Sequence, residues 1–159
     1  MSNEGSEDPF LAKVSFSPRR ENRHAAMQFI YMQDINKTED LETALTLFFR
    51  QKDKPREFYA FAEELIKGTL EHVDTIDETI RTYAKNWDFS RIAKVDLAIL
   101  RLAIYELLYC FHIPPIVSIN EAIDLSKLFS TADSKRFING ILDAFKLKLH
   151  RPLRDASKQ

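Results

Sequence analysis

The sequence predicts an all-α protein of about seven helices in two packed helical halves. Apolar residues recur at spacings of three and four along most of the chain, and no stretch alternates with a period of two. Of the 159 residues, 45% are hydrophobic and 30% are charged, and the formal net charge is −1. This length and composition are typical of one globular domain that buries its own core.

The first part of the chain contains an extension and two predicted helices. Residues 1–16 mix acidic, small and isolated apolar residues without a period, so we expect a flexible N-terminal extension. A first helix is expected to begin at the Ser-Pro pair at 17–18 and to end near Ile35, because Ser caps helices and Pro fits the first helical position. We expect Thr38 to cap a second helix that ends near Gln51.

Two further helices lead to a polar break. The chain restarts at Pro55, and an apolar face from Phe58 to Leu70 predicts the third helix. Asp74 is expected to begin the fourth helix, because a carboxylate stabilises a helix N-terminus. The polar sequence at 86–90 then interrupts the helical pattern.

The densest apolar helix is predicted from about Ile92 to Tyr109. The Pro-Pro pair at 114–115 ends it. Ser118 and Glu121 match a capping box, which predicts the start of the sixth helix.

The seventh helix is predicted to start at residues 132–134. Its apolar spacing runs across Gly140, so we interpret Gly140 as a close contact between helices. We therefore divide the chain into a flexible extension, one helical domain at 17–150 with two halves, and a basic tail: 1–16, 17–84, 85–150 and 151–159.

Two charged residues interrupt the central apolar run. Arg101 and Glu106 lie within it, and a buried charge without a partner is costly. We expect both to have partners, and Asp96 is close enough in sequence to supply one.

The residue types present argue against catalysis. The three glycines are far apart, which excludes phosphate-binding loops, and the four histidines form no metal-ligand pair. Cys110, the single cysteine, has no neighbour in sequence that would lower its thiol pKa, so we interpret it as a core residue. We predict no enzyme activity, no cofactor and no metal site. The N-terminus has no apolar signal region, so we expect a cytoplasmic protein.

Three arginines gather at the start of the first helix. At about 100° per residue, Arg23 and Arg20 lie near 40° and 100° from Arg19, in the same sector as the apolar residues of that helix. Cations at a helix N-terminus oppose the macrodipole, so an external anion such as RNA phosphate is one explanation. The alternative is an exposed helix start whose arginines pair with nearby carboxylates.

Four blocks of sequence resemble the NusB family of bacterial transcription antitermination factors over about residues 18–146. The first is the arginine-rich helix, Arg19-Arg20-x-x-Arg23 with Ala26-x-Gln28-x-x-Tyr31. The others are Ile92-x-x-Val95-Asp96-x-Ala98-Ile99-Leu100-Arg101-Leu102-Ala103-x-Tyr105-Glu106-Leu107, Pro115-x-Val117-x-Ile119-Asn120-Glu121-Ala122-Ile123 and Ser134-x-x-Phe137-x-Asn139-Gly140-x-Leu142-Asp143.

The resemblance implies a function in transcription antitermination by RNA polymerase. A NusB-like protein is expected to bind the boxA element of single-stranded ribosomal leader RNA together with the ribosomal protein NusE, and to be a monomer or homodimer when free. The RNA-binding residues it implies are Arg19, Arg20, Arg23, Gln28, Arg101, Asp133, Lys135 and Arg136. The partner-binding residues it implies are Tyr31, Asp96 and Glu106. Glu21 departs from relatives that carry another arginine there, which could lower RNA affinity without NusE.

Two other interpretations remain open. The same fold serves as the N-terminal module of some ribosomal-RNA cytosine methyltransferases, so the chain could be an RNA-targeting module. It could also be a helical protein-interaction module without RNA binding.

Overall fold

The computed structural model describes residues 16–37 and 40–156, and this part of the chain is all-α, as predicted. It forms seven α-helices and two short 3₁₀ segments, with no strand in the described ranges. The helices are α1 (Pro18–Ile35), α2 (Leu41–Arg50), α3 (Ala60–Glu71), α4 (Val73–Tyr83), α5 (Lys94–Tyr109), α6 (Pro115–Phe129) and α7 (Ala132–Lys146). The 3₁₀ segments are η1 (Arg56–Tyr59) and η2 (Phe89–Arg91).

The first helix begins as predicted, and the second does not. The Ser17 hydroxyl oxygen accepts a hydrogen bond from the Arg20 backbone N–H at 3.3 Å, and Pro18 opens α1. The cap of α2 is Asp40, whose carboxylate accepts from the Glu42 N–H at 3.2 Å. The predicted cap Thr38 is therefore wrong, and that residue lies outside the described ranges.

The capping box predicted for α6 is also wrong. The helix begins at Pro115, which occupies the first helical position. The hydroxyl of the buried Ser118 donates to Glu106 Oε1 at 3.0 Å, and Glu121 accepts from Arg20 of α1. Both side chains of the apparent box are therefore used by tertiary contacts. The start of α7 agrees with the prediction, and its cap is Thr131.

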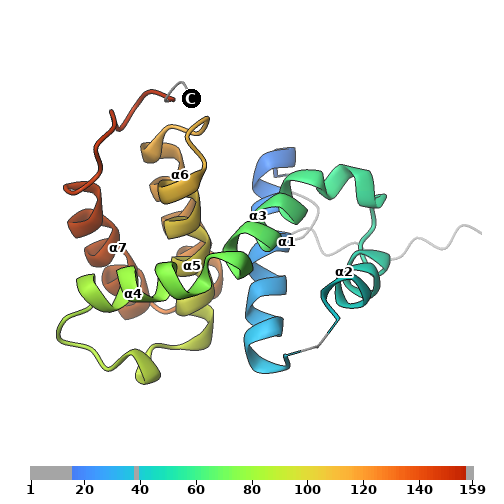
Figure 1. The fold of residues 1–159 in the computed structure, drawn as a ribbon, viewed down its shortest axis with the longest axis horizontal. Coiled ribbons are helices and arrows are strands. Elements are labelled where there is room, and N and C mark those ends of the chain that lie inside the picture. The colour runs from blue at the N-terminus through green and yellow to red at the C-terminus, as the bar shows by residue number, and fades with distance from the viewer. Residues whose placement is uncertain (1–15, 38–39, 157–159) are drawn as a thin grey trace, which may run out of the picture.

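The helices form two groups around α5 (Figure 1). One group contains α1, α2 and α3, and the other contains α4, α6 and α7. Helix α5 packs against α1, α3, α4, α6 and α7, and all its residues from Asp96 to Leu107 are buried. This burial on all sides explains the nearly uninterrupted apolar sequence. Helix α4 packs against α5 and α7, which places it with the second group.

The two helical glycines have opposite environments. A Cβ atom at Gly68 of α3 would lie 2.0 Å from Cζ of Tyr105, so the tyrosine ring packs directly on the glycine backbone. A Cβ at Gly140 would meet no atom within 4 Å. The close helix contact predicted at Gly140 is therefore wrong, and Gly68 fills that role.

Part of the predicted basic tail is docked on the domain. The Arg151 guanidinium donates to the carbonyl oxygens of Leu107 and Ile113 at 3.1 and 3.3 Å, beyond the carboxyl end of α5. The Ile116 N–H donates to the Leu153 carbonyl oxygen at 2.8 Å. A cation at a helix C-terminus is favourable, so Arg151 extends the ordered fold past residue 150. No helix in the described part has the length and hydropathy to span a membrane.

Candidate nucleic-acid interface

Arg19 is the most accessible arginine at the start of α1. Its side chain is exposed, and its guanidinium carbon lies 4.0 Å from the ring centroid of Phe61 on α3. Within the described residues no carboxylate lies at ion-pair distance from Arg19. The aromatic ring holds the guanidinium at the surface while leaving its N–H donors open to an anion.

Arg20 is half-exposed and linked to α6. Its Nε and Nη2 donate to Glu121 at 3.1 and 3.0 Å, and Nη2 also donates to Asp124 at 2.9 Å. The hydrogen bond and charge of Glu121 raise the pKa of Arg20 above its usual value. Because 37% of the side chain is accessible, Arg20 offers an external anion only part of its donor set.

Arg23 is inside the molecule. Its side chain is 4% exposed, and its Nε and Nη2 donate to the Glu106 carboxylate at 3.1 and 2.8 Å. Glu106 is 1% exposed and also accepts from Ser118, so one buried cluster joins α1, α5 and α6. Neither side chain reaches the surface of the free protein, so the structure gives no support to the RNA contact predicted for Arg23 or the partner contact predicted for Glu106.

Arg101 and Asp96 are buried as well. Arg101 is buried and donates from Nε and Nη2 to Asp77 of α4, each at 2.8 Å, and its Nη1 lies 3.3 Å from Asp34 of α1. The buried Asp96 accepts from the Ser130 hydroxyl at 2.7 Å instead of pairing with Arg101 or Glu106. As expected, both charges of the central helix have partners. Those partners come from other helices, so these residues join helices, and their RNA and partner contacts remain predictions.

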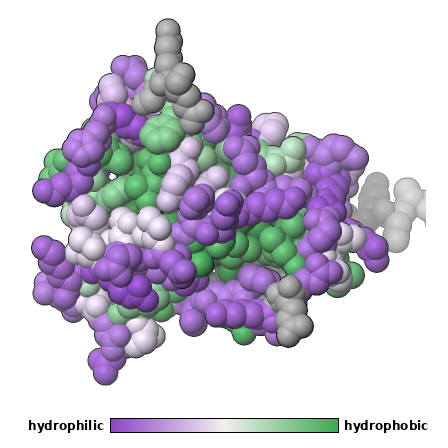
Figure 2. Space-filling view, viewed as in Figure 1, coloured by the Kyte–Doolittle hydropathy of each residue, from purple (hydrophilic) through white to green (hydrophobic). Residues whose placement is uncertain are grey.

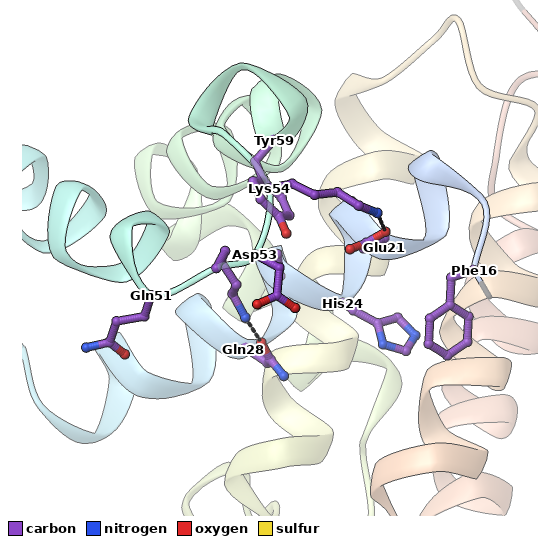
Figure 3. Close-up of a pocket in the computed structure, with 10 residues that line it drawn as sticks. Phe16, Glu21, His24, Gln28, Gln51, Asp53, Lys54 and Tyr59 are labelled. Atoms are coloured by element: carbon purple, nitrogen blue, oxygen red, sulfur yellow. Dashed lines mark hydrogen bonds and ion pairs between the residues drawn. The ribbon is translucent and has the colours of Figure 1, made fainter. Parts of the chain in front are cut away.

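A hollow of about 560 Å³ lies beside the first half of α1 (Figure 3). Gln28 enters it from α1 and accepts a hydrogen bond from Lys52 Nζ at 2.6 Å. Lys54 pairs with Glu21 at 2.5 Å across the same hollow, so Glu21 neutralises a neighbouring cation as well as interrupting the arginines. Burial lowers the pKa of Lys52.

His24 joins α1 to the end of α6. Its ring lies between those of Phe16 and Phe129, at centroid distances of 4.4 and 5.5 Å. Burial, assisted by the positive charge of Arg20, lowers the pKa of His24. The imidazole therefore packs between two aromatic rings, and its neutral form is favoured.

Tyr31 borders an apolar groove of about 420 Å³ on the next turns of α1. Met32, Phe48, Val95 and Phe129 also line the groove, and Met32 and Phe129 are exposed. Figure 2 shows apolar surface reaching the exterior between polar borders on one face of the molecule. The predicted partner residue Tyr31 thus borders an accessible apolar surface.

The start of α7 carries three of the predicted RNA-binding residues. Asp133 and Arg136 form an ion pair and are 88% and 79% exposed, and Lys135 is half-buried. Phe129, which contacts His24 of α1, precedes α7 by only three residues. The end of α6, and with it the chain that leads into α7, therefore lies beside the middle of α1.

Several residues of this surface were not predicted. The sequence alone assigns no role at this surface to His24, Lys52, Lys54 or Phe129. Lys52 and Lys54 could have been noticed as cations flanking a predicted chain restart. The exposure of Phe129 has no sequence signal, because it depends on where α6 ends against α1.

The described residues hold no cluster of metal-ligating side chains, and their cysteine is buried. No group of three or more His, Cys, Asp or Glu there could hold a metal ion. Cys110 is buried, as predicted, and burial raises its thiol pKa to about 12. A thiol with such a pKa is protonated at neutral pH and is a poor nucleophile.

Fold and site together define a class: an all-α protein of two helical groups whose first helix presents arginine at its start. A model of the NusB family matches residues 20–146, and this chain belongs to the NusB family. The transcription antitermination protein NusB of Syntrophus aciditrophicus (strain SB) is 41% identical over 133 residues, which cover 84% of this chain and 82% of that protein.

Solved structures share the fold. NusB of T. maritima is 33% identical with a TM-score of 0.75, over 90% of this chain and 96% of that one. A structure of the antitermination factors NusB and NusE with double-stranded RNA contains a chain that is 23% identical with a TM-score of 0.73, over 82% of this chain and 97% of that one. At that identity the likeness establishes the fold alone.

Proposed function

We propose that this protein is a transcription antitermination factor that binds boxA-type single-stranded RNA in ribosomal leader transcripts together with NusE. The match of the NusB family to residues 20–146 carries the proposal, because its relatives along most of this chain are antitermination proteins. The role is non-catalytic and requires no cofactor. It places the protein in the cytoplasm, as part of an antitermination complex on RNA polymerase.

The RNA contacts are assigned to the exposed cations. Arg19 supplies the strongest phosphate contact, because its guanidinium faces solvent and rests on Phe61. Arg20 contributes where phosphate competes with Glu121 and Asp124. Gln28, Asp133, Lys135 and Arg136 complete the proposed RNA surface. In the same proposal, Arg23 and Arg101 hold the helices that carry these groups.

The NusE contact is assigned to the apolar groove bordered by Tyr31. Exposed apolar side chains lined by polar ones are typical of a protein-binding surface. The groove also offers the free protein a surface for a homodimer, which NusE would displace. A net charge of −1 makes RNA binding by the protein alone weak, so a partner that extends the basic surface raises affinity through linkage.

Fluorescence anisotropy tests the proposal. A labelled boxA RNA is titrated with this protein, with and without NusE, beside a scrambled RNA of the same composition. We expect tighter binding to boxA, enhanced by NusE. Equal weak binding to both RNAs, unchanged by NusE, contradicts the proposal and leaves a helical interaction module.

A further inference from the structure

The loop between α4 and α5 carries an exposed aromatic ring. Trp87 is the single tryptophan of the chain and is 59% exposed. Its backbone N–H donates to the Ala84 carbonyl oxygen at 3.0 Å, which fixes the turn that bears the indole. The indole lies 4.9 Å from the ring of Phe137 on α7, so one side of it is supported by the fold. The ring is held in place while much of its surface remains in solvent.

A hollow of about 670 Å³ lies beside this ring, and we call it the Trp87 hollow. Its lining includes Trp87, Lys85, Arg136, Phe137 and Gly140. Glycine inside a helix lowers stability relative to alanine, yet a Cβ at Gly140 would touch nothing within 4 Å. The packing of the free protein therefore gives no reason for glycine at this position. Its missing side chain keeps the hollow open.

The charges around the hollow favour an anionic ligand with a flat ring. Two cations and one carboxylate line the hollow: Lys85 is exposed, and Arg136 pairs with Asp133 one turn earlier on α7, so the lining carries a net positive charge. The carboxylate of Asp88, also nearby in sequence, is occupied in capping η2 through Ser90. A nucleotide presents both a π face for the indole and a phosphate for the cations.

The Trp87 hollow is close to the surface proposed for RNA. Arg136 belongs to both, and α7 begins three residues after Phe129, which contacts His24 of α1. The four-residue step from Phe129 to Asp133 spans at most about 14 Å. An RNA strand that passes the start of α7 would therefore reach the indole.

We propose that the Trp87 hollow binds one unpaired base of the RNA strand, with the indole stacked on the base and Lys85 and Arg136 at the flanking phosphates. The proposal rests on the proposed function and adds a base-stacking site to it. Stacking on an aromatic ring tolerates any base, so this site contributes affinity rather than sequence choice.

The single tryptophan makes a direct test possible. Tryptophan emission of the full chain, excited at a wavelength where its five tyrosines do not absorb, reports on Trp87 alone, and stacking quenches it. Titration with boxA RNA, in the presence of NusE, is expected to quench the emission and protect it from acrylamide. NusE can add its own emission or alter that of Trp87. This protein is therefore mixed with NusE first, and the change in emission on adding RNA is measured.

Variants measure the contribution to affinity with labelled RNA. Trp87→Ala is expected to weaken RNA binding about tenfold, and Trp87→Phe to restore most of it, because phenylalanine keeps a stacking face. Gly140→Leu is expected to weaken binding while keeping the helix content, since the added side chain enters open space. Leu147→Ala, at an exposed apolar residue beyond the same helix, is the matched control.

The outcomes separate this proposal from the proposed function. RNA binding that depends on Arg19 but not on Trp87 or Gly140 overturns the stacking site and leaves the antitermination role intact. A Trp87 signal that responds to NusE and not to RNA identifies the hollow as a protein contact and also overturns it. Absence of RNA binding by every form of the protein overturns both.

Discussion

The arginines of this protein occupy two different environments. Arg23 and Arg101 are buried, and each binds carboxylates from other helices in a fixed geometry. Arg19 and Arg136 are exposed: Arg19 rests on the ring of Phe61, and Arg136 pairs with the exposed Asp133. Arg19 and Arg23 are one helical turn apart on α1, so residue type and sequence neighbourhood do not decide between the two roles. How deeply each side chain is buried decides whether the arginine is structural or faces solvent.

Removal of the buried arginine is expected to have the largest effect on stability. Arg23→Ala leaves the Glu106 carboxylate buried without its cation, which lowers the free energy of unfolding by about 3–5 kcal/mol. Urea denaturation followed by circular dichroism measures the loss.

A double variant serves as control for that loss. Arg23→Met with Glu106→Leu removes both charges and retains apolar volume, so it is expected to be more stable than Arg23→Ala alone. A loss of less than about 1 kcal/mol for Arg23→Ala, the range of exposed ion pairs, would show that the pair is not effectively buried.

The two glycines provide the next comparison. Gly68→Ala forces the Tyr105 ring away from α3 and is expected to cost about 1–3 kcal/mol. Gly140→Ala enters open space and is expected to stabilise α7 by about 0.5–1 kcal/mol. Thermal melts of the two variants should therefore shift in opposite directions. A shift in the same direction would contradict the assigned packing.

The exposed arginines are expected to affect RNA binding far more than folding. Arg19→Ala with Arg20→Ala should change the unfolding free energy by about 1 kcal/mol or less, because Arg19 is exposed and the ion pairs of Arg20 with Glu121 and Asp124 are partly solvated. The salt dependence of RNA binding should flatten by about 0.7 in log–log slope for each phosphate that the variant no longer neutralises.

A matched variant tests the specificity of that effect. Lys67→Ala with Lys146→Ala removes two cations that each hold one local carboxylate, on α3 and α7. It should leave the salt slope unchanged. An equal loss of slope in both variants would attribute RNA binding to net charge rather than to the start of α1.

The smallest expected effect is a pH dependence from His24. Burial lowers the pKa of this imidazole in the folded state, so the neutral form is favoured there. Its stabilising contribution is complete above the unfolded pKa of about 6.5 and is lost as pH falls through that value toward the folded pKa. The difference in Tm between wild type and His24→Gln should therefore narrow between neutral and mildly acidic pH. A difference that widens on acidification has the wrong sign for a buried neutral histidine.

The helices were more predictable than their caps. Apolar periodicity correctly placed α1, α5 and α7, because burial of a helix face leaves a regular pattern in the sequence. Ser118 and Glu121 imitate a capping box, but Glu106 and Arg20 provide them with better partners. A short capping motif cannot show this competition, because the competing groups are distant in sequence.

The candidate site was predicted in part. The sequence correctly indicated that Arg101 and Glu106 need partners, but it could not indicate Asp77, Asp34 or Arg23. Helical geometry places all three arginines in the inward sector of α1, which holds for the buried Arg23 and not for the exposed Arg19. It could not show that α5 and α6 approach closely enough to bury the guanidinium.

By itself, the sequence determined an all-α chain, the approximate helix boundaries and a family resemblance, because these depend on local spacing and on the order of motifs. The tertiary structure decided which arginines are structural and which face solvent, where the glycines matter, and that Trp87 borders an open hollow. The physical reason is that a charge or a glycine acquires its role from atoms brought close by packing. Those atoms come from helices far apart in the chain, such as Glu106 beside Arg23 and Tyr105 upon Gly68.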